Sequence, residues 1–217
     1  QAVEVTKLSL LLKVLEGETQ ASLSQQLKLF HERALPDLGE NIKCGNSLIE
    51  HDFTGNRQGE FFDDEKLERI NPFDWKDEFS EIVSNGGFEI VIGNPPYVDS
   101  EWMTKHWPLE REYIARKYAA ASGNWDLFCA FVERALQYCK PGGSSSFIVP
   151  NKLGSADYAA QARKVVATDN TLVKIRDYSE IPVFPVAVYP IVYVSKKITP
   201  PDSHNVVFEK MRHDDNG

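Results

Sequence analysis

Apolar residues recur with a helical period over residues 2–15, 73–84 and 124–139. In each stretch the apolar positions lie three or four residues apart, so they would share one face of a helix. Residues 124–139 carry the broadest apolar stripe, and Pro141 and the glycines after it are suited to end the helix. We also expect helices over the polar stretch 18–34 and over about 155–167.

Short apolar runs between these stretches predict β-strands. The runs cover residues 41–44, 88–93, 146–149, 172–178 and 186–195, and the last continues towards 206–208. Strands that alternate with helices favour an α/β fold, with a mostly parallel sheet and helices on both faces. Ligands of such sheets bind at the carboxyl ends of the strands. Polar corners at Asn46, Asn94 and Asn151 follow three predicted strands, so we expect them on one edge of the sheet.

Composition narrows the class of protein. The 217 residues are 42% hydrophobic and 26% charged, as in soluble globular domains. No apolar run reaches the roughly 20 residues of a membrane helix, and the first residues do not resemble a signal peptide. Three unpaired cysteines favour a reducing, cytoplasmic location, and neither Cys nor His spacing predicts a metal site.

The net charge of −8 does not by itself indicate nucleic-acid binding, but a whole-chain sum hides local patches. Lys105, His106, Arg111, Arg116 and Lys117 lie in the aromatic-rich segment 98–123. A solvated charged helix would have the same composition. Because the segment is long for a connection, we expect a lid or a DNA-contacting insert there.

The most distinctive motif is Asn94-Pro95-Pro96-Tyr97, directly after the predicted strand 88–93. An exocyclic amine on a purine is a poor nucleophile, because its lone pair is delocalised into the ring. Two acceptors aimed at the amino hydrogens, here the Asn94 side-chain oxygen and the Pro95 carbonyl, would stabilise the charge that develops on nitrogen. The prolines stiffen the loop, and Tyr97 offers a ring for stacking. A plain turn would also use Asn-Pro-Pro, so the flanking sequence must decide.

With these residues assembled, the chain resembles the class I S-adenosyl-L-methionine-dependent DNA adenine-N6 methyltransferases, and among them the type IIG restriction–modification enzymes. Residues 41–48 look like the third motif of that family, and residues 87–97 look like its catalytic fourth motif. Residues 126–143 and 147–151 are similar to the fifth and sixth motifs. Residues 183–185, followed by the strand at 192–194, are similar to the eighth.

The resemblance implies roles for seven residues. Asn94, Pro95, Pro96 and Tyr97 would form the catalytic loop, with Tyr97 stacked on the adenine. Phe184 would contact the other side of a base flipped out of double-stranded DNA. Asn46 and Phe131 would contact the cofactor, S-adenosyl-L-methionine. Asn46 stands where the family usually has an acidic residue, and Phe128 is a rival to Phe131. Helix core is the alternative role for both phenylalanines.

The glycine-rich first motif of the family and its ribose-binding acidic residue are absent from residues 1–217. We therefore expect a fragment of a methyltransferase domain that binds the cofactor poorly and is inactive alone. A target-recognition domain, or a nuclease domain, would lie elsewhere in the parent protein. The oligomeric state and the recognition sequence cannot be read from these residues.

Two other classes of function stay open. Protein-glutamine methyltransferases also use Asn-Pro-Pro-Tyr, because an amide nitrogen poses the same chemical problem, and RNA adenine methylation uses similar chemistry. The segment 98–123 and Phe184 favour a base-flipping enzyme over a protein-glutamine methyltransferase, whereas RNA adenine methylation stays open. A non-catalytic, DNA-contacting domain that keeps the fold is the third possibility.

Overall fold

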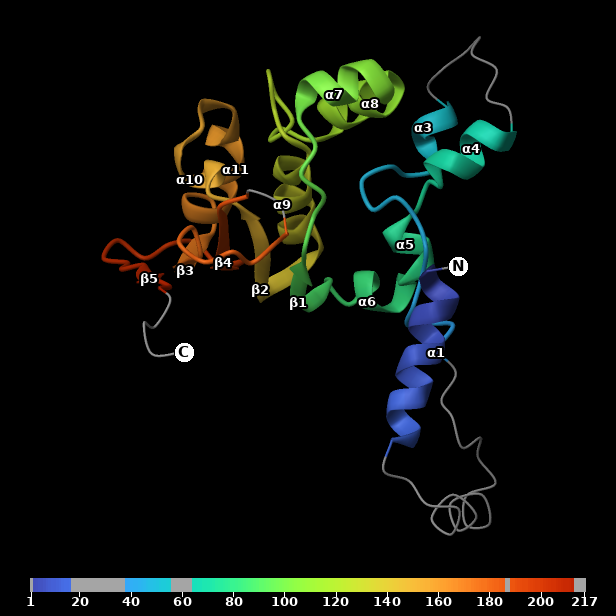
Figure 1. Cartoon of the computed structure of the whole chain (residues 1–217), viewed down its shortest axis with the longest axis horizontal. Coiled ribbons are helices and arrows are strands. Elements are labelled where there is room, and N and C mark those ends of the chain that lie inside the picture. Colours follow the sequence, from blue (N-terminus) through green and yellow to red (C-terminus); the bar gives the residue numbers. More distant parts are fainter. Residues whose placement is uncertain (1, 17–37, 56–63, 186–187, 213–217) are drawn as a thin grey trace. The chain divides into compact units, whose positions relative to one another are not determined.

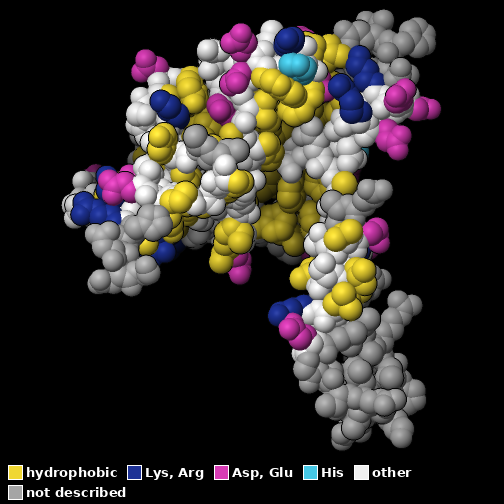
Figure 2. Space-filling model, viewed as in Figure 1, with side chains coloured by type: hydrophobic (Ala, Val, Ile, Leu, Met, Phe, Trp, Pro, Cys, Tyr) yellow, Lys and Arg dark blue, Asp and Glu magenta, His cyan; other side chains and the backbone are white. Residues whose placement is uncertain are grey.

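The computed structural model describes residues 2–16, 38–55, 64–185 and 188–212. The chain divides into two compact units, Gln1–Gly45 and Asn46–Gly217. Helix α1, Ala2–Leu15, confirms the first predicted helix. Its apolar residues Val5, Leu8 and Leu12 are 62%, 58% and 58% exposed, and hydrophobic side chains stand out along this helix in Figure 2. The helix expected over 18–34 lies outside the described residues.

The strand predicted over residues 41–44 is wrong. The backbone N–H groups of Asn41 and Ile42 both donate to the carbonyl of Leu38, at 3.1 and 2.9 Å, so the segment closes a turn. The first extended pairing comes later, as a single parallel bridge between Asn46 and Pro72. Only Ile42 and Cys44 are apolar in this segment, too few to hold a strand against the local turn.

The second unit contains a five-stranded sheet in the order β1-β2-β4-β3-β5 (Figure 1). Its strands are β1 Phe88–Gly93, β2 Cys139–Pro150, β3 Thr171–Asp177, β4 Pro190–Lys196 and β5 Val207–Lys210. The pairs β1–β2 and β3–β5 are parallel, whereas β4 is antiparallel to both of its neighbours. Four strands thus run in one direction and β4 is reversed. The prediction of an α/β fold with a mostly parallel sheet is confirmed.

Three helical segments cover one face of this sheet. They are α9 Leu127–Tyr138, α10 Lys152–Ser155 and α11 Ala160–Ala167, with the 3-10 turn η1 Asp157–Ala159 before α11. Phe128 and Val132 of α9 are fully buried in one core with Phe147 and Val149 of β2. The core also includes Tyr193 of β4. Alternate residues of β2 are buried, as expected for a strand with one face in a core.

The opposite face of β1 is not covered. Ile90 and Ile92 are 67% and 75% exposed, and the register places them beside Ser144 and Ser146 of β2. Among the described residues, β1 pairs with β2 on one edge only. The expected helices are therefore seen on one face of this strand. Its other face and its outer edge present apolar side chains and backbone groups to solvent.

A second core lies under the segment that follows β1. Helices α7 Ser100–His106 and α8 Pro108–Lys117 form within the segment 98–123. Tyr113 and Ile114 of α8 are buried with Leu48, Ile49 and Phe53. Short helices α3 Asp52–Gly55 and α4 Asp64–Ile70 flank this core. The segment 98–123 is thus a packed helical pair.

Two element boundaries in the structure differ from those predicted from the sequence. The helix expected over 73–84 is split into α5 Trp75–Glu78 and α6 Ser80–Ser84, because Phe79 adopts non-helical backbone angles of φ −131° and ψ 45°. Strand β2 begins at Cys139, directly after α9, so residues 140–143 extend the strand instead of forming a loop. No helix in the described parts of the chain is long and apolar enough to cross a membrane.

Candidate active site

The loop Asn94–Tyr97 begins where β1 ends at Gly93, at the carboxyl end of the strand. A Cβ on Gly93 would lie 3.1 Å from the ring of Phe147, so only glycine lets the chain pass this ring without displacing it. Pro95 is buried, whereas Asn94 and Pro96 are exposed. No described residue hydrogen-bonds to the Asn94 side chain. The loop is therefore anchored at its proline and presents a free amide.

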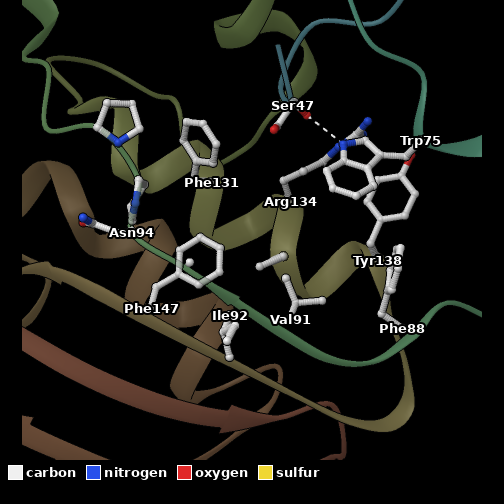
Figure 3. A pocket seen from close by; sticks show the side chains of 14 residues that line it. Ser47, Trp75, Phe88, Val91, Ile92, Asn94, Phe131, Arg134, Tyr138 and Phe147 are labelled. Atoms are coloured by element: carbon white, nitrogen blue, oxygen red, sulfur yellow. Dashed lines mark hydrogen bonds between the residues drawn. The ribbon is translucent and has the colours of Figure 1, made fainter. Parts of the chain in front are cut away.

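A cavity of about 210 Å³ opens beside this loop. Asn94, Pro95 and Pro96 line one end of it, together with Phe131 and Phe147 (Figure 3). Ser47, Trp75, Arg134 and Tyr138 line the other end. The indole N–H of Trp75 donates to the carbonyl of Ser47 at 3.2 Å, which fixes the ring against the segment 46–50. The walls are thus mainly aromatic, with polar groups at the two ends.

Arg134 supplies the charge at the far end. Its side chain is only 9% exposed, and its guanidinium pairs with Glu50 and lies 4.4 Å from the centre of the Tyr138 ring. Lys117 of α8 also pairs with Glu50 and donates to the hydroxyl of Tyr113 at 2.7 Å. This network joins α8 to α9 beneath the cavity.

Tyr97 does not line this cavity. Its hydroxyl donates to the carbonyl of Ile148 at 3.1 Å, and its ring meets the edge of Phe184 at a centroid distance of 6.3 Å. Burial, and after it the charge of Asp126, raise the pKa of Tyr97 to about 12. Tyr97 therefore stays protonated and serves through its ring and its O–H donor.

The two candidate phenylalanines of α9 have different environments. Phe128 is fully buried and packs at the edge of the Tyr158 ring. Phe131 is half-buried and lines the cavity. Of the two rings, only that of Phe131 borders the space beside Asn94.

Comparison with known proteins bears on what this cavity does. The model of the Eco57I restriction-modification methylase family matches residues 1–184. This chain belongs to that family. The type II restriction enzyme and methyltransferase RM.Eco57I of Escherichia coli is 32% identical over 183 residues, which are 84% of this chain and 16% of that protein. The type II methyltransferase M.PaeR7I of Pseudomonas aeruginosa is 32% identical over 111 residues, or 50% of this chain and 19% of that protein.

Two solved structures of restriction-modification proteins align with part of this chain at low sequence identity. The type IIL restriction-modification enzyme MmeI in complex with DNA aligns with a TM-score of 0.48 and 15% identity, over 64% of this chain and 18% of that one. The type IIG restriction endonuclease BpuSI aligns with a TM-score of 0.40 and 19% identity, over 54% and 14%. This methylase chain spans less than a fifth of the length of these proteins and of the two relatives above.

Of the residues that the resemblance singled out in this methylase, Asn94, Pro95, Pro96 and Phe131 share one cavity. Asn46 does not line it, although the next residue, Ser47, does. The Asn46 side-chain oxygen accepts from the backbone N–H of Leu48 at 3.2 Å and so stabilises the turn that presents Ser47. The roles assigned to these residues stay predictions.

Sequence reasoning missed Trp75, Arg134 and Tyr138 of the methylase. Arg134 had a signal: it is a charged residue inside the apolar stripe of the predicted helix 124–139. Residues 131, 134 and 138 recur at helical spacing, so Arg134 and Tyr138 share a face with Phe131. Trp75 had no comparable signal, because its place depends on pairing between segments 46–49 and 71–73.

The structure also brings together His51, Asp74 and Asp77, whose potential ligand atoms lie within 4.8 Å of one another. No sequence motif predicted this group. Exposed acidic side chains often cluster without an ion, and we assign no metal role to it.

Proposed function

We propose that this chain is part of a site-specific DNA methyltransferase that modifies the N6 amino group of adenine, with S-adenosyl-L-methionine as methyl donor. The observation that carries the proposal is the shared cavity of Asn94, Pro95 and Phe131 at the carboxyl end of β1. Membership of a restriction-modification methylase family supports DNA as the substrate. The residues of the catalytic loop support adenine as the target.

In this proposal Asn94 and Pro95 act on the amino group of the base. The Asn94 side-chain oxygen and the Pro95 carbonyl would each accept one amino hydrogen. Their partial negative charges would stabilise positive charge on the nitrogen as the new N–C bond forms and the methyl–sulfur bond of the donor breaks, and the nitrogen would then release one proton to solvent. Because Pro95 is buried, its carbonyl would keep a fixed direction. No metal ion and no covalent enzyme intermediate are required by this chemistry.

The walls of the cavity suit the proposed cofactor in polarity, and its volume of about 210 Å³ is below the roughly 300–1,000 Å³ of complete sites for molecules of that size. Aromatic walls from Phe131, Trp75 and Tyr138 suit a flat adenine ring, and electron-rich ring faces also attract a sulfonium cation. Ser47 and Arg134 would offer polar contacts at the end away from Asn94 (Figure 3). When bound there, S-adenosyl-L-methionine would supply an electrophilic methyl group.

Tyr97 and Phe184 would hold the extruded base. The Tyr97 ring is oriented by its hydrogen bond to Ile148, so its face has a defined direction. Phe184 lies beside Tyr97 in a T-shaped arrangement with a centroid distance of 6.3 Å, so both rings are close enough to contact one base. Base–aromatic stacking of about 1–3 kcal/mol would offset part of the cost of extruding the base.

We also infer that another part of the parent methylase packs against β1. The exposed Ile90 and Ile92, next to an unpaired strand edge, favour a further strand and covering helix there. The much greater length of the relatives is consistent with this inference. The cofactor cavity would then be completed by residues outside this chain, and the chain alone would bind the cofactor weakly.

The test uses the intact parent methylase with S-adenosyl-L-methionine labelled in its methyl group, and a mixture of DNA, RNA and protein. We expect label at N6 of adenine in double-stranded DNA. Asn94→Ala should abolish it, whereas Asn205→Ala, an exposed asparagine outside the cavity, should keep full activity. Label on cytosine, on RNA or on a protein amide would contradict the proposal, and no label at all would support a non-catalytic domain.

A further inference from the structure

Helix α7 carries two stacked aromatic rings on its surface, those of Trp102 and His106, which we call the aromatic pair. Trp102 is 40% exposed, and its ring lies on that of His106 with the ring centres 4.2 Å apart and the planes 22° apart. Trp107 meets Trp102 in a T-shaped arrangement at a centroid distance of 4.6 Å. Because Trp102 and His106 are both exposed, the pair offers aromatic surface to another flat group.

The aromatic pair is held in place beside the catalytic loop. Asp99 caps α7 by accepting from the backbone N–H of Trp102 at 2.7 Å, and Met103 of the same helix is buried in the second core. The helix begins three residues after Tyr97. Between them, the carbonyl of Val98 accepts from the first turn of α9 at 2.9 Å. A ligand of the pair would therefore meet a preorganised surface next to the proposed base-binding loop.

Positive charge accompanies the aromatic pair. Lys105 and His106 lie in the last turn of α7 and are exposed, whereas Glu101 lies in its first turn. Lys105 forms no ion pair with any described residue. The Nδ1–H of His106 donates to the carbonyl of Trp102 at 2.9 Å, because a carbonyl oxygen can only accept, and this leaves Nε2 for an outside partner. Figure 2 shows basic, histidine and hydrophobic side chains side by side over α7 and α8.

Helix stability alone does not account for this arrangement. Basic residues in the last turn of a helix stabilise its dipole, and that effect would explain Lys105 and His106. It gives no reason for an exposed tryptophan one turn earlier. A ligand with both a flat ring and a negative charge would use the rings and the cation together.

We propose that the aromatic pair binds one nucleotide of the substrate DNA next to the extruded adenine, with its base on the rings and its phosphate at Lys105. When a base leaves the duplex, the bases beside it lose a stacking neighbour, and a protein side chain can take that place. An aromatic side chain of a protein partner would use the rings but would leave Lys105 without an anion. The inference rests on the proposed function, because it needs DNA at the catalytic loop.

The first experiment measures binding of the intact parent methylase to a duplex that carries its methylation site, by fluorescence anisotropy. Trp102→Ala should weaken binding by about 5- to 150-fold, the range for loss of one base–aromatic stack. Trp102→Phe, which keeps a ring, should retain most of the affinity. Phe208→Ala is the matched control, because Phe208 is a 60% exposed aromatic residue in β5, outside this surface. It should bind as the wild type does.

DNA that lacks single bases separates stacking from folding damage. In a series of duplexes, one base at a time is missing from the positions around the target adenine. At one position the missing base should weaken binding of the wild type but not of Trp102→Ala, because this variant has no stack to lose. Wild-type affinity in Trp102→Ala, or an equal effect of every missing base on both proteins, would overturn the inference. The ring would then pack against another part of the parent protein.

The salt dependence of binding tests the phosphate contact. Lys105→Gln should reduce the slope of log K against log salt by about 1, because one phosphate contact is lost. Lys196→Gln, at an exposed lysine that ends β4, is the control and should keep the wild-type slope. An unchanged slope in Lys105→Gln would overturn the phosphate contact while adenine methylation by the wild type continues. Failure of the wild type to methylate DNA adenine would instead overturn the proposed function, and this inference with it.

Discussion

Removing Glu50 should loosen α8 and α9 together. The Glu50 carboxylate, whose side chain is 15% exposed, binds both Arg134 of α9 and Lys117 of α8. In Glu50→Ala the Arg134 guanidinium, only 9% exposed, would keep its charge with no carboxylate beside it. Removing one partner of a buried ion pair costs about 3–5 kcal/mol, because the other charge stays desolvated. Since Lys117 retains Asp52 at 3.5 Å, we expect the lower end of that range.

The pH dependence of the pair has a defined sign. Burial acts to raise the pKa of Glu50, but the hydrogen bonds from Lys117 and Arg134 outweigh it and hold the pKa below the usual value. The native state therefore favours the ionised carboxylate. The stabilisation is complete above the unfolded-state pKa and is lost as the pH falls through the lower native value. The stabilities of wild type and Glu50→Ala should therefore be compared at neutral pH, where the stabilisation is complete.

Hydrogen–deuterium exchange of the parent methylase measures this effect locally. A loss of about 3 kcal/mol should speed exchange of the peptides that cover α8 and α9 by about 150-fold. Arg134→Met in the Glu50→Ala background should restore most of the protection, because it removes the unpaired charge. Asp169→Ala, which breaks the exposed pair with Lys164, should change exchange of these peptides little. Exchange within twofold of wild type in Glu50→Ala would refute the reasoning.

Three further outcomes follow from packing and charge. Phe128→Ala should destabilise the fold by about 3–5 kcal/mol in urea unfolding. Phe131→Ala should mainly weaken cofactor binding, measured by calorimetry. If the two variants lost stability and cofactor affinity equally, the cavity assignment would be contradicted. Gly87→Ala should destabilise the fold strongly, because the new Cβ would lie 2.3 Å from the carbonyl oxygen of the last residue of α9. Gly86→Ala is the control: the nearest atom to its new Cβ is 4.0 Å away, so this variant should bear only the cost of a positive φ. Because burial raises the pKa of Asp126 to about 6, the native state binds its proton more tightly, so stability should fall by about 2 kcal/mol as the pH rises from 4 to 6. Urea midpoints of Asp126→Asn should lack that slope.

The elements that sequence predicted well are those whose pattern is local. Helix α9 and strand β1 follow from local apolar patterns and, for α9, from the stop residues after it, and each needs no distant partner to be recognised. The failures depend on distant contacts. The start of β2 at Cys139 is set by pairing with Phe88, and this pairing overrides the helix-stopping and turn-forming residues 140–143. The break at Phe79 goes with its packing against Trp75 and Phe88, which no local pattern reveals.

The candidate site divides in the same way. Asn94, Pro95 and Pro96 could be predicted from the sequence because the residues that give the loop its chemistry are consecutive. The far wall of the cavity could not, because Trp75 and Arg134 come from segments about 60 residues apart. The environment of Trp125 was hidden for a related reason, because only the fold shows that its indole N–H lacks a hydrogen-bond partner among the described residues.

The bare edge of β1 has a practical consequence for handling this protein. A strand that offers unpaired backbone groups together with Ile90 and Ile92 is a template for pairing with any other extended chain. Two copies of the isolated 217-residue chain can pair there, edge to edge. A charged substitution such as Ile92→Lys should reduce the oligomers that form through this edge.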